Sequence, residues 1–159
     1  MFIRTLERIQ MSVGVVSLCI FFTAIIVQIV TRHLKVAVIW TEEVANYSFV
    51  WAIFMGAAVM VSRREHFSFD FLTTRFKGKK KAKLYFFNDT VIMLFSIAIF
   101  FYGLQAMTTF WDYNWTALPF LKMGYVWMSI PIMGLTMFIY TFNHLIGNYK
   151  VLRSKEVAE

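Results

Sequence analysis

The chain has 159 residues, of which 59% are hydrophobic and 16% charged, and its formal net charge at pH 7 is +7. Soluble domains contain about 45–50% apolar residues, so the composition argues against a soluble protein. The single cysteine, Cys19, excludes an internal disulfide or a cysteine-based zinc cluster, and we expect it to be a small buried residue. The apolar excess forms four blocks, each near the ~20 residues that a helix needs to cross a bilayer. The sequence therefore predicts an all-α, four-helix integral membrane protein with one membrane domain over residues 1–159.

The first two apolar blocks cover about residues 11–31 and 42–62. The first has no charged residue and is longer than the apolar core of a cleaved signal peptide, so we expect it to remain as a span. The second begins with Glu42 and Glu43 and carries no further charge up to Ser62. Both blocks are predicted to be membrane-spanning helices.

The third and fourth blocks cover about residues 84–108 and 124–146. The third contains Asp89, which we expect to lie near the membrane boundary and to pair with a nearby Lys or Arg. The fourth contains Pro131, whose missing N–H leaves the carbonyl of Trp127 free and should kink the helix. Membrane helices tolerate such a kink when neighbouring groups satisfy the freed carbonyl.

Most Lys and Arg residues lie before the first span, between the second and third spans, or after the fourth span. Positive residues that flank spans stay in the cytoplasm, so both termini are predicted to be cytoplasmic. One basic cluster near the start of the third span is predicted to fix this topology and to bind anionic lipid rather than nucleic acid. Its members are Lys79, Lys80, Lys81 and Lys83.

The segment between the second and third spans, "EHFSFDFLTTRF" (Glu65–Phe76), alternates apolar and polar residues. Its phenylalanine rings are suited to the boundary between headgroups and acyl chains. We therefore predict a short interfacial segment, separated from the third span by a break at Gly78.

The sequence offers few groups for chemistry. Its three histidines, His33, His66 and His144, are predicted to lie at mismatched depths, which disfavours a haem or metal site. No catalytic residue, metal ligand or cofactor is predicted, and we do not expect an enzyme. The predicted spans also contain no central carboxylate, the usual candidate for a proton or substrate site inside a membrane, so transport by this chain alone is not expected.

The start of the second span, "WTEE", is the most informative stretch. Thr41 is expected to cap the helix, which would place Glu42 and Glu43 in its first turn, where the helix dipole favours anions. Residues at intervals of four then form one stripe along the helix: Glu43, Tyr47, Trp51 and Met55. This stripe suits a docking face for a partner and an internal face of the bundle equally well.

The stretch from Trp40 to Leu72 resembles the small membrane (DctQ-like, Q) subunit of tripartite ATP-independent periplasmic (TRAP) transporters. The motif consists of a Trp, a Glu pair, aromatic residues, Gly-Ala-Ala, a basic pair, a His and an Asp. Here these are Trp40, Glu42, Glu43, Tyr47, Trp51, Gly56, Ala57, Ala58, Arg63, Arg64, His66, Asp70 and Leu72. Pro131 and Gly134 also fit the family, whereas Glu65 and Phe71 depart from it.

The resemblance implies a bacterial inner-membrane protein in a sodium-coupled importer of carboxylates, such as C4-dicarboxylates or sialic acid. A large M subunit would carry the substrate and sodium sites, a periplasmic binding protein would deliver the substrate, and this chain would support the scaffold. We expect it to contact the M subunit through one set of residues: Trp40, Glu42, Glu43, Tyr47, Trp51, Gly56 and Arg63.

Two other functions stay open at this point. A small exporter working as a homodimer would transport by itself and would need an essential carboxylate. A membrane enzyme or electron-transfer anchor would carry a metal or chromophore.

Overall fold

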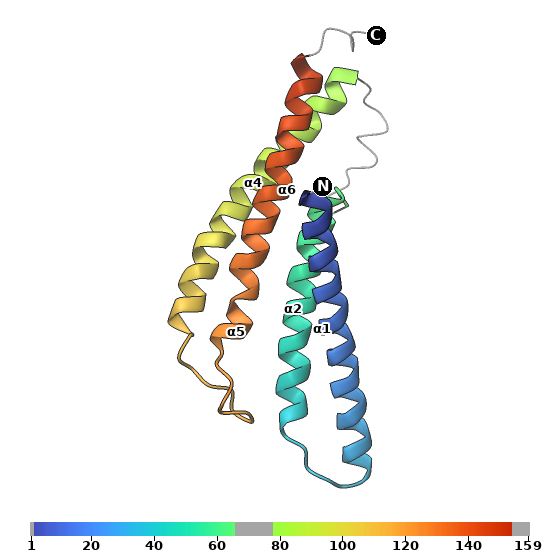
Figure 1. Cartoon of the computed structure of the whole chain (residues 1–159), viewed down its shortest axis with the longest axis vertical. Coiled ribbons are helices and arrows are strands. Elements are labelled where there is room, and N and C mark those ends of the chain that lie inside the picture. Colours follow the sequence, from blue (N-terminus) through green and yellow to red (C-terminus); the bar gives the residue numbers. More distant parts are fainter. Residues whose placement is uncertain (1, 66–77, 154–159) are drawn as a thin grey trace.

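The structure, a computed structural model, describes residues 2–65 and 78–153 (Figure 1). Its helices are α1 (Phe2–His33), α2 (Trp40–Ser62), α4 (Gly78–Thr109), α5 (Gly124–Trp127) and α6 (Ser129–Arg153). Four helical segments are long and apolar enough to cross a membrane: Phe2–His33, Trp40–Ser62, Lys81–Thr109 and Gly124–Val151. The predicted all-α, four-span architecture is confirmed.

The helices form two antiparallel hairpins, in which α1 packs along α2 and α4 packs along α6 (Figure 1). The hairpins meet mainly between α2 and α6. The connections at residues 34–39 and 110–123 lie at one end of the bundle, and the start of α1 and the end of α6 lie at the other (Figure 1). We call these the loop end and the terminal end.

The helices run past the apolar blocks on which the spans were predicted. α1 begins at Phe2, nine residues before the first block, because helical hydrogen bonding continues through its polar first turns. The fourth span is interrupted at Met128, which separates α5 from α6. Pro131 lies in the first turn of α6, three residues after this break, and the kink expected at Pro131 stays a prediction.

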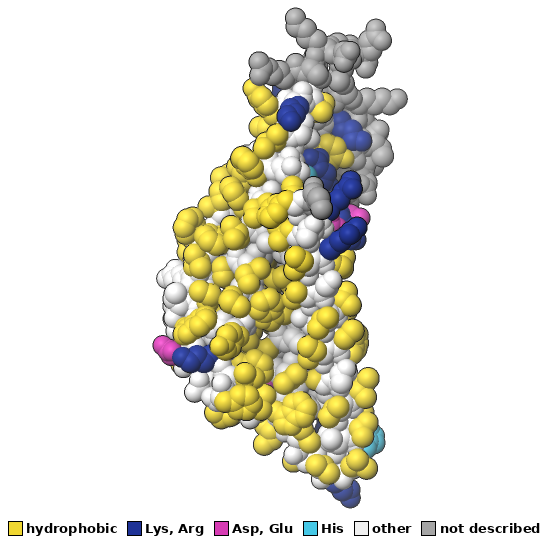
Figure 2. Space-filling view, in the orientation of Figure 1, with side chains coloured by type: hydrophobic (Ala, Val, Ile, Leu, Met, Phe, Trp, Pro, Cys, Tyr) yellow, Lys and Arg dark blue, Asp and Glu magenta, His cyan; other side chains and the backbone are white. Residues whose placement is uncertain are grey.

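The core lies between the two hairpins. Its buried residues come from α2 and α6 and are Ala58, Val61, Met133, Met137 and Tyr140. α1 and α4 instead leave broad apolar faces exposed, and hydrophobic side chains cover most of the face seen in Figure 2. Cys19 lies on such an exposed face of α1, so the expectation that it is buried was wrong.

The predicted interfacial segment, Glu65–Phe76, falls outside the described residues except for Glu65. The motif residues His66, Asp70 and Leu72 therefore also lie outside the described residues. The helix that follows begins at Gly78, where the break was predicted. Lys81 and Lys83 lie in its first two turns, and the side chains of Lys79 and Lys80 are not described.

Candidate functional site

The "WTEE" stretch begins α2 without the predicted cap. The capping position is Ile39, which makes no side-chain hydrogen bond to the helix. Thr41 is fully buried, and its hydroxyl donates to the carbonyl of Val38 at 3.0 Å, so its prediction as the cap was wrong. Glu42 and Glu43 do lie in the first turn, as predicted.

Glu43 fastens the 110–123 connection to α2. Its two carboxylate oxygens accept hydrogen bonds from the backbone N–H groups of Thr116 and Ala117, at 2.7 and 2.9 Å. Hydrogen bonds from backbone donors to a carboxylate are about twice as strong as neutral ones. Glu43 therefore has partners within the chain and holds the loop end of one hairpin against the other.

Two further members of the stripe continue this contact between the hairpins. The Tyr47 ring packs edge-on against the Trp115 ring, with centroids 4.4 Å apart. The indole N–H of Trp51 donates to the carbonyl of Tyr125 in α5 at 3.1 Å. Met55 is 2% exposed. Of the two interpretations of the stripe, the structure supports the internal face of the bundle.

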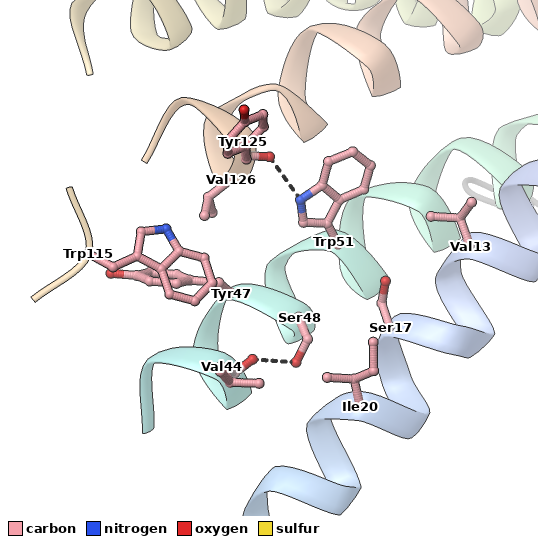
Figure 3. A pocket seen from close by; sticks show the side chains of 10 residues that line it. All are labelled: Val13, Ser17, Ile20, Val44, Tyr47, Ser48, Trp51, Trp115, Tyr125 and Val126. Carbon is pink, nitrogen blue, oxygen red and sulfur yellow. Dashed lines mark hydrogen bonds between the residues drawn. The ribbon is translucent and has the colours of Figure 1, made fainter. Parts of the chain in front are cut away.

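A pocket of about 330 Å³ lies beside this stripe, between α1, α2 and the start of the fourth span (Figure 3). Its lining residues are Val13, Ser17, Ile20, Val44, Tyr47, Ser48, Trp51, Trp115, Tyr125 and Val126. The Ser48 hydroxyl donates a hydrogen bond to the carbonyl of Val44 at 2.6 Å. The lining carries no charged side chain.

Nearer the terminal end, a buried polar group joins α1 to α6. The Gln10 amide donates to the Thr136 hydroxyl at 2.8 Å, and the Tyr140 hydroxyl donates to the Gln10 carbonyl at 2.5 Å. Gln10 is 3% exposed and Tyr140 is fully buried. Sequence reasoning missed this group because Gln10 precedes the first apolar block and was placed outside the span.

A buried ion pair ties the end of α2 to α4 and α6. Asp89 accepts hydrogen bonds from the Arg64 guanidinium at 3.1 Å and from the Asn148 amide at 2.6 Å. The predicted pairing of Asp89 with a basic residue is confirmed. His144 Nδ1 lies 4.0 Å from the other oxygen of Asp89. The end of α2, α4 and α6 therefore converge on one carboxylate.

Arg63, next to this pair, contacts α1 instead. Its guanidinium lies 2.8 Å from a Glu7 carboxylate oxygen, and the second oxygen of Glu7 accepts a hydrogen bond from Ser62 at 3.2 Å. The hydrogen bond to Glu7 raises the pKa of Arg63. Glu7 thus holds the end of α2 against α1, as Glu43 holds its beginning against the loop.

The structure separates the seven predicted partner residues into two groups. Glu43, Tyr47, Trp51 and Arg63 make the contacts within the chain described above. Trp40 is 43% exposed at the loop end, Glu42 is exposed, and a Cβ added at Gly56 would have no neighbour within 4 Å. Trp40 and Glu42 leave their main surface free for another molecule, and the Arg63 side chain is also 45% exposed.

The arrangement is suited to holding helices together. No cluster of three or more His, Cys, Asp or Glu residues that could hold a metal occurs within residues 2–65 and 78–153. His33 contacts the carbonyl of Ile29 at 2.9 Å, and His144 lies beside Asp89 near the opposite end of the bundle.

Comparison with known proteins decides the family. The family model for the DctQ component of tripartite ATP-independent periplasmic transporters matches residues 11–150. The chain belongs to the DctQ family. It is also 25% identical over 154 residues to the sialic acid TRAP transporter permease protein SiaT of Haemophilus influenzae (strain 86-028NP). That match covers 95% of this chain and 24% of SiaT, so the chain spans about a quarter of the length of this relative.

Membership of the DctQ family confirms the predicted resemblance and identifies the chain as a TRAP transporter small permease component. Together with the four apolar spans, it places this DctQ chain in the bacterial inner membrane as a multi-pass protein.

Replacing Glu43 with alanine is expected to loosen the 110–123 connection. Two hydrogen bonds to a partly exposed carboxylate are lost, which should cost about 1–2 kcal/mol locally. The detergent-purified chain should then be cleaved by trypsin after Lys122 about 5- to 30-fold faster, because cleavage follows the population of the open loop.

The matched control is Glu42→Ala, at the neighbouring exposed carboxylate that has no hydrogen-bond partner among the described residues. It should leave the cleavage rate within about twofold of the unmodified chain. Equal acceleration by the two substitutions would contradict the role given to Glu43.

Proposed function

We propose that the chain is the small permease subunit of a sodium-coupled TRAP importer of carboxylates, of the C4-dicarboxylate or sialic acid type. In this proposal it is the structural partner of a large M subunit and does not bind the substrate. The family match supports the assignment to a TRAP permease. The name of the relative SiaT, a sialic acid TRAP transporter permease, supports a carboxylate substrate.

One observation carries the structural role. Within the described spans, every acidic side chain except Glu42 at the edge of α2 already has a hydrogen-bond or ion-pair partner in the chain. Glu7 is paired with Arg63, Glu43 with two backbone amides, and Asp89 with Arg64 and Asn148. A substrate or sodium site needs charged or oxygen ligands that are available to the ion. These carboxylates instead hold helices together, which is the function of a scaffold.

The same contacts argue against a small exporter acting alone. Such a protein needs an accessible carboxylate in a span that changes its partner or its proton during transport. Asp89 is the most buried candidate, with a side chain 5% exposed, and it is held by two hydrogen-bond donors. Its surroundings favour one fixed arrangement.

The proposed orientation follows the distribution of positive charge. The terminal end, with Lys81 and Lys83, would face the cytoplasm and anionic lipid. The loop end would face the periplasm, where the 34–39 and 110–123 connections lie within reach of a substrate-binding protein. Trp40, Glu42, Gly56 and the other predicted partner residues are proposed to support contact with the M subunit, directly or through the helices that they position.

Reconstituted vesicles test this function. The chain, the M subunit and the binding protein encoded with it are combined, and uptake of radiolabelled succinate and sialic acid is measured under an inward sodium gradient. We expect uptake of one carboxylate only when all three are present and only with sodium. Sodium-independent uptake, or transport by this chain alone, would overturn the proposal.

A further inference from the structure

The side of α2 that faces away from the internal stripe carries a second stripe. At about 100° per residue, six residues fall within an arc of about 80°. They are Glu42, Asn46, Phe49, Ile53, Gly56 and Met60, and we call them the outward stripe. Phe49, Ile53 and Met60 are 41%, 49% and 39% exposed, and Glu42 and Asn46 are also exposed. Phe49 stacks on Phe21 of α1, with ring centroids 4.9 Å apart, whereas Ile53 and Met60 are left exposed by the described chain.

Asn46 is a polar residue on this stripe whose side chain is poorly suited to contact with lipid. α2 has 23 residues and is therefore about 34 Å long, close to the ~30 Å hydrocarbon core. Asn46 lies six residues, or about 9 Å, from the start of α2, which places its amide inside the apolar layer. None of the described residues hydrogen-bonds to this side chain, and a polar group exposed to hydrocarbon without a partner is costly.

Gly56 is the second unusual residue on the same stripe. A Cβ added at Gly103 would lie 2.9 Å from the backbone nitrogen of Pro131, and one added at Gly134 would lie 2.8 Å from the backbone of Phe100. These two glycines are explained by close packing within the chain. Gly56 is half-buried, and its backbone nitrogen lies 3.9 Å from the Cβ position of Gly14 in α1. A Cβ at Gly56 would meet nothing within 4 Å, so its glycine leaves a notch beside α1, where another backbone can approach closely.

From these two residues we propose that the outward stripe of α2 docks against a transmembrane helix of a different protein. That helix supplies a hydrogen-bond donor to Asn46, a basic group to Glu42 at the membrane edge, and its backbone to the notch at Gly56. This inference rests on the proposed function, in which the partner is the large M subunit.

Charge argues for a different chain as the occupant rather than a second copy. A two-fold dimer of parallel helices along this stripe would bring the two Glu42 carboxylates together at the same membrane edge. Like charges held together are destabilising, and no basic side chain lies on the outward stripe to compensate for them. A partner with a basic group at this depth removes the repulsion.

Cross-linking from defined positions locates the docked face. In a Cys19→Ser background, single cysteines are introduced as Asn46→Cys and Ile53→Cys on the outward stripe, with Leu94→Cys and Phe101→Cys on the exposed face of α4 as controls. Each is labelled with benzophenone maleimide in membranes that also contain the M subunit, and then irradiated. We expect an adduct with the M subunit from the two stripe positions and none from α4.

Each other outcome overturns a specific statement. Adducts from α4 only, or none from the stripe while the M subunit still co-purifies, would overturn the docking face and leave the proposed function standing. A stripe adduct at twice the mass of this chain would indicate a second copy. Failure of the unmodified chain to co-purify with the M subunit would overturn the proposed function itself.

Two substitutions measure what the stripe contributes. Asn46→Leu should weaken binding of the M subunit about 3- to 20-fold, the range of one hydrogen bond between membrane helices. Gly56→Leu should reduce co-purified M subunit at least as much, because it fills the notch. Gly147→Leu on α6, also at a glycine with nothing within 4 Å, is the matched control and should retain the M subunit. Equal retention by all three variants would overturn the proposal.

Discussion

The Asp89→Ala variant is expected to lose about 2–3 kcal/mol of stability in detergent. Removing the carboxylate leaves the Arg64 guanidinium and the Asn148 amide without their acceptor at the point where α2, α4 and α6 meet. Breaking a fully buried ion pair costs about 3–5 kcal/mol. The expected loss is smaller because the Arg64 side chain is 31% exposed and regains some contact with water.

Asp112→Ala provides a matched control for this prediction. Asp112 also forms an ion pair, with Lys122 at 2.8 Å, but its side chain is 86% exposed. Exposed pairs contribute about 0–1 kcal/mol, so the free energy of unfolding of this variant should be close to that of the unmodified chain. Stability is measured by titrating the folded chain in mixed micelles with denaturing detergent. Equal losses for the two variants would contradict the structural role of Asp89.

The Gly134→Val variant is expected to separate α4 from α6. A Cβ at this position would lie 2.8 Å from the backbone nitrogen of Phe100 and 3.0 Å from its Cα. Backbone atoms cannot move aside as a flexible side chain can, so the two helices must shift apart. Overpacking of this kind costs about 1–3 kcal/mol, and we expect the upper end of this range because the whole helix pair has to move.

Gly147→Val, in the same helix, separates this clash from the general effect of adding a valine. Its Cβ would meet nothing within 4 Å, and valine is a slightly better helix former than glycine. The control should therefore keep its stability within about 0.5 kcal/mol. A stable Gly134→Val variant with an unchanged thermal unfolding midpoint would contradict the close contact between α4 and α6.

The sequence predicted the four spans and the pairing of Asp89 because both depend on local properties. Span length and hydropathy are read directly from consecutive residues. A buried carboxylate close to a basic loop has few alternatives to an ion pair.

Other features could not be predicted because they depend on which elements meet in space. Periodicity grouped Glu43, Tyr47, Trp51 and Met55 on one face of a helix, but the partner of that face proved to be the 110–123 connection and α5. The Thr41 cap was wrong because the turn before α2 already has helical backbone angles at Ile39, which directs the Thr41 hydroxyl to Val38.

The candidate partner surface shows the same limit. Glu42 and Glu43 are adjacent in the sequence, but successive side chains of a helix point in different directions. Glu42 therefore faces outward, whereas Glu43 faces the 110–123 connection. Asn46 drew no attention in the sequence, and its significance comes only from the exposed face on which it lies.

The central claim is that this DctQ chain supports a larger permease subunit. The most direct test is to tag the chain, express it with its genomic neighbours, solubilise the membranes gently, and measure the mass and composition of what is recovered. We predict one larger multi-span protein in a fixed ratio to this chain, with carboxylate transport only when both are present. Recovery of this chain alone, as a dimer that moves solute by itself, would contradict the account.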